Sequence, residues 1–439
     1  MKKAIIVASA IMLLGVFGSK TYGQKQLFGY YTNWSTYAKE FQPDNISVLK
    51  LTAALYAFFK PIPTSFTIES SDAWSDFGDG GGKDNIKKFI NVMHSQKKPA
   101  IMSIGGWSYC YPVDLLGQCI QNNKELFASN IVNFIDNVVR AKTGLSFDGV
   151  DIDWEPYGNQ WNQCSQQELQ NYVNFLDVLN KKIKTAYGSW YWLMIAMPGS
   201  KASIEKLGTT MVTYNGESMS ALTAISKIVD YMNVMAYDYN GPAFSSYTDL
   251  LSPVYSDPQS PTPAGVQEAV ELYKKYCPSE NTWKVVLGFP AYGLAFQNIP
   301  NITPPSHDFA VGTYQSSDPS KDVPNGQWLN GNFDYKFIAK APFEYSYDIF
   351  ADEENTQITG HAAWTSNLSY DGYDDAGNKK HFDSPNVWIS WETPGTLKEK
   401  AKLVKDAGFG GMMVWTLDAD IPSGQQGSLI DTARNALDN

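Results

Sequence analysis

The chain has 439 residues, of which 43% are hydrophobic and only 18% are charged. That composition supplies a large core and excludes an intrinsically disordered chain. The net charge of −11 argues against nucleic acid or an anionic membrane surface as a partner and suits a neutral one. Aromatic residues make up 14%; we expect most to be buried and roughly a quarter to line a groove.

The N-terminus has the pattern of a secretory signal peptide. Two lysines precede an apolar run over residues 4–17, and small residues follow up to Gly23. The run is shorter than the roughly 20 residues of a membrane-spanning helix. We therefore predict a signal peptide over residues 1–23, cleavage before Gln24, and a protein that is secreted (extracellular or periplasmic) with no membrane attachment after cleavage.

Strand-like and helix-like patterns then alternate along the chain. Candidate strands end near Tyr31, Phe58, Ile104, Asp153, Met197, Ala236, Phe289 and Trp415. Helical patterns lie between them, at 85–94, 123–142, 166–187, 219–228 and 262–276, the last opening with an N-cap Thr262 before Pro263. Eight such units predict an α/β fold, a (β/α)8 TIM barrel, whose active residues lie at the carboxyl ends of the strands.

Residues 148–155 carry the most informative pattern, Asp-Gly-Val-Asp-Ile-Asp-Trp-Glu. The period of two places Asp151, Asp153 and Glu155 on one face of a strand, while Asp148 is out of phase and reads as structural. Carboxylates this close cannot all ionise cheaply, so one should keep its proton to high pH and serve as a general acid. A solvated strand face or a hard-cation site would be the alternative. Trp154 within the run and Phe147 before it argue against free solvation.

The interval between the seventh and eighth strands is too long for one helix. Its aromatic stretches at 333–337 and 387–391, and the turn-like 375–378, favour strands and hairpins. We predict a barrel built from residues 24–293 and 391–439, interrupted by a small α+β insertion at 294–390, with a returning helix over 396–405.

The acidic pattern after Phe-Asp-Gly resembles the catalytic signature of glycoside hydrolase family 18, the chitinases. The likeness continues through short motifs at the other strand ends: Phe28–Tyr31, Leu55–Phe58, Ser103–Trp107, Met235–Asp238, Gly288–Gly293 and Gly410–Trp415. The resemblance implies a chitinase that hydrolyses β-1,4-linked N-acetylglucosamine in chitin or chitooligosaccharides as a monomer. No cofactor is implied, and with only four His and no Cys-x-x-Cys we expect no metal site.

The resemblance also implies roles for individual residues. Glu155 would protonate the leaving oxygen, while the substrate's own acetamido oxygen acts as nucleophile with retention of configuration. Asp153 would orient the acetamido group, and Asp151 would share a proton with Asp153. Tyr237 would donate a hydrogen bond to the acetamido group, and Asp238 would bind the same sugar.

Further residues would surround the sugar in such an enzyme. Trp415 would form the floor under the scissile ring, and Trp107 would stack on the leaving-group side. The remaining candidates either line the pocket or hold the acids, and a structural role is equally consistent with most of them: Tyr30, Phe58, Ser103, Met235 and Tyr292.

Two positions depart from the family pattern. Pro156 precedes Tyr157 where an aromatic residue and then proline are usual, and Leu294 stands where arginine is usual. The first change could redirect the loop beside the acid, and the second removes one charged contact.

Four cysteines are available to an exported chain for pairing. Cys110 and Cys119 bracket a short loop and are the favoured disulfide. Cys164 and Cys277 either pair or stay free.

Two other functions remain open. An endo-β-N-acetylglucosaminidase acting on glycoprotein glycans would share the barrel and chemistry. A non-catalytic sugar-binding relative typically lacks the motif glutamate, whereas Glu155 is present here.

Overall fold

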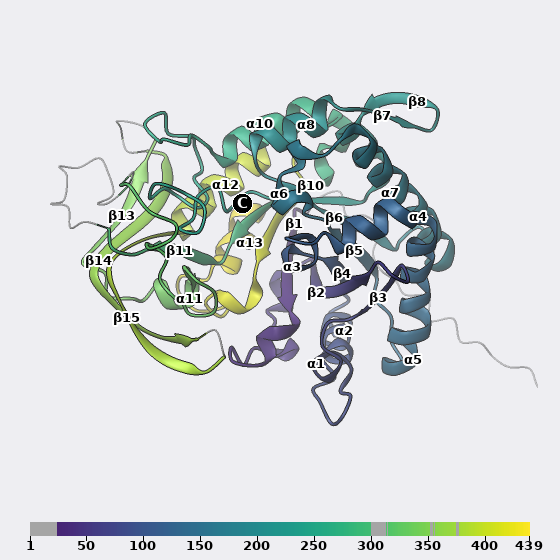
Figure 1. Ribbon diagram of the computed structural model, residues 1–439, viewed down its shortest axis with the longest axis horizontal. Coiled ribbons are helices and arrows are strands. Elements are labelled where there is room, and N and C mark those ends of the chain that lie inside the picture. The colour runs from purple at the N-terminus through teal and green to yellow at the C-terminus, as the bar shows by residue number, and fades with distance from the viewer. Residues whose placement is uncertain (1–23, 300–312, 314, 352–353, 355, 375–376) are drawn as a thin grey trace, which may run out of the picture.

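The computed structural model describes residues 24–299, 313, 315–351, 354, 356–374 and 377–439. Eight parallel strands of this part of the chain close into a barrel (Figure 1). Closure comes from the first strand, which pairs with both the second and the last. The barrel strands are β1 (Gln26–Thr32), β2 (Ala53–Ile62), β4 (Ala100–Gly105), β5 (Gly149–Asp153), β6 (Trp192–Pro198), β9 (Tyr231–Met235), β10 (Val285–Pro290) and β16 (Gly411–Trp415). The predicted TIM barrel is confirmed.

Helices surround the barrel, and short elements fill the connections. The main helices are α2 (Asn85–Ser95), α4 (Leu115–Phe134), α7 (Gln166–Tyr187), α8 (Lys201–Thr209), α9 (Ala221–Ile228), α10 (Val266–Tyr276), α12 (Pro394–Asp406) and α13 (Leu429–Asp438). The short elements are η1 (Asn33–Thr36), η2 (Pro43–Asn45), η3 (Val48–Lys50), β3 (Thr67–Ser70), α1 (Ala73–Phe77), η4 (Ile135–Val139), α5 (Arg140–Thr143), β7 (Met211–Tyr214), β8 (Glu217–Ser220) and η6 (Ser279–Lys284).

Three predicted helix starts are displaced, each for a local reason. The 123–142 segment belongs to a longer helix that begins at Leu115 and breaks at Asn123, whose side chain caps the second part through Leu126 N–H (3.3 Å). Met219 lies in the β7–β8 hairpin, so α9 begins after Ser220. Thr262 does not cap α10, because its hydroxyl donates to Asn240 Oδ1 (2.9 Å) and the helix begins at Val266.

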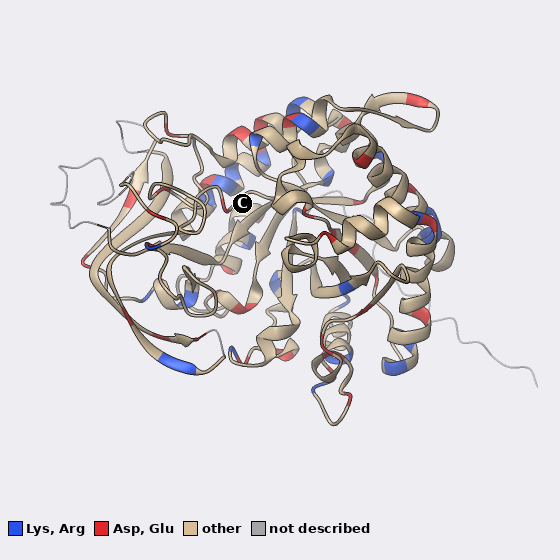
Figure 2. Ribbon diagram, in the orientation of Figure 1, with Lys and Arg blue, Asp and Glu red and all other residues tan. Residues whose placement is uncertain are grey.

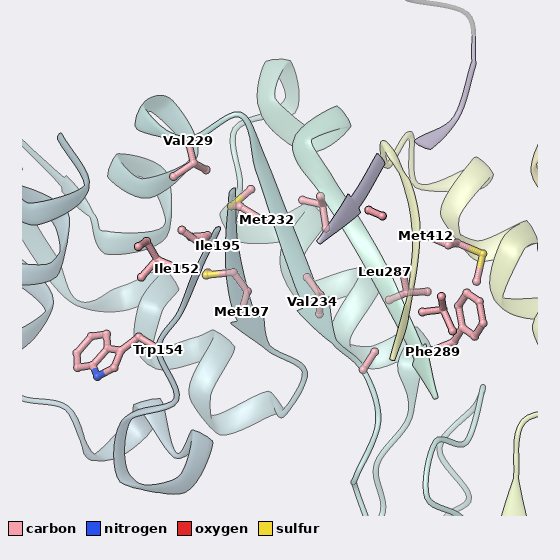
Figure 3. Packing of buried hydrophobic residues seen from close by; sticks show 14 of the residues in the cluster. Ile152, Trp154, Ile195, Met197, Val229, Met232, Val234, Leu287, Phe289 and Met412 are labelled. Atoms are coloured by element: carbon pink, nitrogen blue, oxygen red, sulfur yellow. The ribbon is translucent and has the colours of Figure 1, made fainter. Parts of the chain in front are cut away.

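The barrel strands divide their side chains between two cores. Alternate residues such as Val150 and Ile152 pack outward against the helices in the larger core, part of which Figure 3 shows. The inward residues form a smaller cluster that includes Phe28, Tyr30 and Met413. Side chains therefore fill the barrel, and polar groups on its axis are isolated from bulk water.

The insertion is a five-stranded antiparallel sheet beside the barrel (Figure 1). It contains β11 (Tyr292–Phe296), β12 (Asn332–Asp334), β13 (Tyr345–Phe350), β14 (Ile358–Tyr373) and β15 (Lys379–Trp391), with α11 (Tyr335–Ile338) after β12. The strand predicted at 333–337 is therefore wrong after Asp334, because α11 begins at Tyr335. Part of the turn expected at 375–378 lies outside the described residues.

Buried lysines join the insertion and its flanks to the barrel. Lys39, on the loop after β1, contacts Asp334 of β12 (2.9 Å) and Asp418 after β16 (2.6 Å). Lys400 of α12 pairs with Glu392 and donates to Ser252 Oγ (2.6 Å), whose hydroxyl donates to the carbonyl of Ala236 (2.6 Å). Both lysines thus have a partner close to the carboxyl end of a barrel strand, Asp418 after β16 and Ser252 beside Ala236.

The other charged residues are spread over the helices around the barrel, the loops and the insertion (Figure 2). No helix in the described part of the chain is both long and apolar enough to cross a membrane.

Candidate active site

The acid row, defined as Asp151, Asp153 and Glu155, lies at the carboxyl end of β5. The aspartates point into the barrel because they alternate with the outward-facing Val150 and Ile152. Glu155 follows the strand and precedes the short α6 (Pro156–Asn159). Their exposed fractions are 0%, 4% and 8%, so all three are buried and the exposure increases along the row toward Glu155.

Asp151 is the most deeply hydrogen-bonded member of the row. Its Oδ2 accepts hydrogen bonds from Ser103 Oγ (2.6 Å) and Tyr30 OH (3.0 Å), and Asn233 Nδ2 lies 3.5 Å from Oδ1. Burial raises the pKa of Asp151 to about 6, while these donors oppose the rise by stabilising the carboxylate.

Asp153 and Glu155 have no comparable donors within the described part of the chain. Asp153 Oδ1 is buried without a hydrogen-bond partner among the described residues. Burial, the charge of Glu155 and the charge of Asp151 together hold the pKa of Asp153 well above its usual range. Burial and the charge of Asp238 raise the pKa of Glu155 to about 8. The shift is in the direction that a general acid needs, because it favours the protonated form of Glu155.

Tyr237, Asp238 and Tyr292 follow the carboxyl ends of β9 and β10 and form a second group of polar residues in the site. Tyr292 OH donates to Asp238 Oδ1 (2.6 Å), and the rings of Tyr237 and Tyr292 meet edge to face at 6.4 Å. Desolvation by the surrounding protein raises the pKa of Asp238 to about 6, and the hydrogen bond from Tyr292 opposes this rise. Part of the Asp238 residue is nevertheless exposed to solvent. Burial and then the charge of Asp153 raise the pKa of the Tyr237 hydroxyl, which stays a donor.

Aromatic rings make the floor of the site. Trp415 at the end of β16 stacks on Phe58 (5.6 Å, 24°) and meets Tyr30 edge to face (5.3 Å). Trp34 continues from Phe58 toward solvent (6.2 Å) and is 47% exposed. Met235 is nearly buried at the end of β9. Such a surface offers flat apolar contact for a sugar ring.

Trp107 stands apart from this floor. It begins α3 (Trp107–Cys110), directly after Gly105 and Gly106, and is 51% exposed. A Cβ on Gly105 would lie 2.3 Å from the carbonyl oxygen of Asp153, and one on Gly106 would lie 2.5 Å from the Phe58 ring. Only glycine allows the chain to pass this close to the acid row and to Phe58.

The structure accounts for the two departures from the family pattern. Pro156 begins α6, and Tyr157, Gly158 and Asn159 all have positive φ, which turns the chain sharply beside Glu155. Leu294 lies on β11, and its side chain contacts Gly241. The contact is close: a Cβ on Gly241 would lie 2.8 Å from Leu294 Cδ1.

Asn233 is the site residue that the sequence analysis missed. It lies on β9 and points into the barrel, between Tyr231 and Met235. The period of two along β9 could have identified Asn233 from the sequence. A polar residue at an inward position of a buried strand needs a hydrogen-bond partner inside the barrel. Asp148 lies near the amino end of β5, where Oδ2 accepts from Ala100 N–H (2.8 Å), as a structural residue would.

The expected disulfide between Cys110 and Cys119 is absent, since all four cysteines are buried free thiols. Cys110 Sγ instead donates to the carbonyl oxygen of Asp153 (3.5 Å). The described residues contain no group of three or more His, Cys, Asp or Glu side chains suited to a metal ion.

Comparison with known proteins fits this geometry. The model of glycosyl hydrolases family 18 matches residues 26–420. The chain belongs to this family. It is 28% identical to chitinase 1 of Aphanocladium album over 93% of the chain and 84% of that protein, and 27% identical to endochitinase 1 of Metarhizium robertsii with the same two coverages.

Solved structures of family members share the fold. A chitinase from Bacillus thuringiensis superposes with a TM-score of 0.69 at 21% identity, covering 94% of this chain and 70% of that one. The second catalytic domain of a group II chitinase from Ostrinia furnacalis, solved in complex with penta-N-acetylchitooctaose, gives 0.68 at 20% identity, covering 94% and 96%.

Proposed function

We propose that this family 18 hydrolase is a chitinase that cleaves β-1,4-linked N-acetylglucosamine chains by a retaining, substrate-assisted mechanism. One observation carries the proposal: Glu155 is buried, with a raised pKa, and follows Asp153 in the acid row, whose buried Oδ1 has no partner within the described residues. A proton donor beside an unoccupied acceptor suits a substrate that supplies both a leaving oxygen and an N–H group.

The chemistry then runs in two steps. The acetamido oxygen attacks the anomeric carbon as the bond to the leaving oxygen breaks, and Glu155 transfers its proton to that oxygen. The resulting oxazolinium ion carries a positive charge, which the Asp151–Asp153 pair balances while Asp153 accepts the N–H. Water next adds to the anomeric carbon and gives a proton to Glu155, the bond from that carbon to the acetamido oxygen breaks, and the acetamido group re-forms with the β configuration retained.

The remaining residues hold the reacting sugar. Tyr237 donates to the acetamido oxygen, and Asp238, fixed by Tyr292, accepts from a sugar hydroxyl. Trp415 supports the ring from below, and its contacts with Phe58 and Tyr30 keep that floor rigid. Tethering the nucleophile beside the reacting carbon makes the attack effectively unimolecular.

The proposal includes export of the mature chain. It rests on the charged and apolar pattern of residues 1–23, which lie outside the described residues. N-terminal sequencing of protein recovered from the culture medium would test it, and the expected first residue is Gln24.

Partly deacetylated chitosan tests the mechanism. Every new reducing end should be N-acetylglucosamine in the β configuration, because a glucosamine residue there has no acetamido nucleophile. Frequent glucosamine at those ends, or an inverted anomer, would contradict it. Parallel incubation with a high-mannose glycoprotein separates the endo-β-N-acetylglucosaminidase alternative, and binding to chitin without cleavage would indicate a lectin.

A further inference from the structure

Two neighbouring aromatic rings on the loop after β4 are left unused by the mechanism above. Trp107 and Tyr111 are 51% and 47% exposed, and their centroids lie 5.2 Å apart with planes at 47°. The Tyr111 N–H donates to the Trp107 carbonyl (2.8 Å), so a single turn fixes both residues. Two adjoining exposed rings make a contiguous apolar surface, and such a surface can mark a ligand-binding groove.

The loop that follows Glu155 supports both rings from behind. A Cβ on Gly158 would lie 3.1 Å from Trp107 Cη2 and 3.4 Å from Tyr111 Cδ2, so the Gly158 backbone lies against the edges of the two rings. This contact uses the left-handed turn of Tyr157, Gly158 and Asn159 (φ 54°, 68° and 59°). It arises where the sequence departs from the family pattern.

Both ends of this supporting turn are anchored. Tyr157 OH donates to Glu168 Oε1 at the start of α7 (2.7 Å). Asn159 Oδ1 accepts from the indole N–H of the fully buried Trp161 (3.1 Å). A rigid backing lowers the entropic cost of binding, because the rings need not be ordered by the ligand.

We infer that Tyr111 extends the Trp107 surface into an additional subsite for an N-acetylglucosamine ring on the leaving-group side of the cleft. The chemistry follows from the surface, since flat apolar faces take the C–H face of a neutral pyranose ring. This inference rests on the proposed function. It predicts that chains long enough to reach Tyr111 bind more tightly than chains that stop at Trp107.

Calorimetry with chitohexaose, in a Glu155→Gln background that prevents cleavage, tests the inference. Tyr111→Ala should weaken hexamer binding by about two- to tenfold. Tyr111→Phe should bind like its parent because the ring remains. Tyr111→Leu keeps apolar volume without a flat ring and should lose binding as the alanine variant does, provided its thermal melt is unchanged.

Two controls separate this inference from the proposed function. Trp190→Ala removes a ring of similar exposure (48%) ahead of β6, at the opposite end of the barrel, and should leave hexamer binding unchanged. In the active enzyme, Tyr111→Ala should leave turnover of an aryl chitobioside unchanged, because that substrate has no sugar beyond the scissile bond. Hexamer binding equal to the parent in Tyr111→Ala would overturn the inference alone. A wild type that cleaves neither substrate would overturn both.

Discussion

Two sets of buried acids lie at the carboxyl end of the barrel: the acid row, and Asp418 after β16. They differ in whether a cation lies beside the carboxyl group. The acid row has no lysine or arginine among its hydrogen-bond or ion-pair partners in the described structure, whereas Asp418 is held by Lys39 (2.6 Å). Burial raises the pKa values of Asp153 and Glu155. Burial alone would also raise the pKa of Asp418, but the charge and hydrogen bond of Lys39, the hydrogen bond of Thr416 and the charge of Lys336 together lower it below its usual value.

The comparison shows how one fold assigns opposite tasks to the same side chain. Without a cation, a buried carboxyl group keeps its proton and can donate it; with one, it stays ionised and links segments of the chain. Lys39 joins three segments through Asp334 and Asp418, while Lys400 joins α12 to the strand end that carries Tyr237. The four predictions below test this division.

The largest expected effect is on turnover in Glu155→Gln. Removing the proton donor should lower kcat on chitotetraose by about 10²- to 10⁴-fold while oligosaccharide binding persists, because the proton moves only in the transition state. Glu125→Gln, which changes an exposed glutamate on α4, is the matched control and should be neutral. A kcat within tenfold of the wild type would rule out Glu155 as the acid.

The next effect is on stability. Lys400→Met leaves Glu392 buried without its cation and should lower the free energy of unfolding by about 3–5 kcal/mol in urea titrations. Adding Glu392→Gln should recover much of that loss. Lys142→Met breaks an exposed pair with Asp79 and should cost about 1 kcal/mol or less. Equal losses in the Lys400 and Lys142 variants would mean that burial does not distinguish these pairs.

The two sets of acids should also give opposite pH dependences of stability. The folded protein holds the Glu155 proton more tightly than the unfolded chain does, so its contribution to stability falls as pH rises from about 4.5 toward about 8. Glu155→Gln should therefore gain stability relative to wild type over that interval. The contribution of Asp418 is present above its ordinary pKa of 3.8 and is lost as pH falls through the lowered folded value.

Unfolding measurements from pH 3 to pH 9 on wild type, Glu155→Gln and Asp418→Asn would check both signs. The penalty of Asp418→Asn should stay constant above pH 5 and shrink on acidification. Parallel curves for the two variants would contradict the comparison.

The smallest effect concerns Asp151. Ser103 donates to its carboxylate (2.6 Å) and lowers its pKa, so Ser103→Ala should raise that pKa and move the acidic limb of kcat/KM upward by about one pH unit. Ser129→Ala, on the exposed side of α4, should not move it. An unmoved limb in Ser103→Ala would show that another group controls it.

Sequence alone predicted the parts of this protein that depend on local periodicity. Alternation placed Asp151 and Asp153 inside the barrel, and strand ends were found within a few residues from Tyr31 to Trp415. The family model and the barrel confirm the resemblance to family 18.

Features fixed by distant contacts were not predictable in the same way. Thr262 is a favourable N-cap residue, but its hydroxyl donates a hydrogen bond to Asn240 instead. The aromatic pattern at 333–337 predicted a strand, but a helix begins at Tyr335. Lys39 and Asp334 are 295 positions apart, so no local pattern pairs them. Cys110 and Cys119 are close in sequence, yet Cys110 faces Asp153.

The closure of the barrel also determines when β1 can find both of its neighbouring strands as the chain is synthesised. β1 is held on one side by β16, where residues 26–29 pair with 411–414, and Arg434 of α13 donates to the carbonyl of Lys25 (2.9 Å). A ribosome or export channel that delivers the chain from its amino end presents β1 long before these partners exist. One edge of β1 must therefore remain open until almost the whole chain has emerged, and unpaired strand edges invite association with other chains. The Trp415 floor ends β16, so it cannot form before nearly the whole chain has emerged, and hydrolytic activity requires a closed barrel.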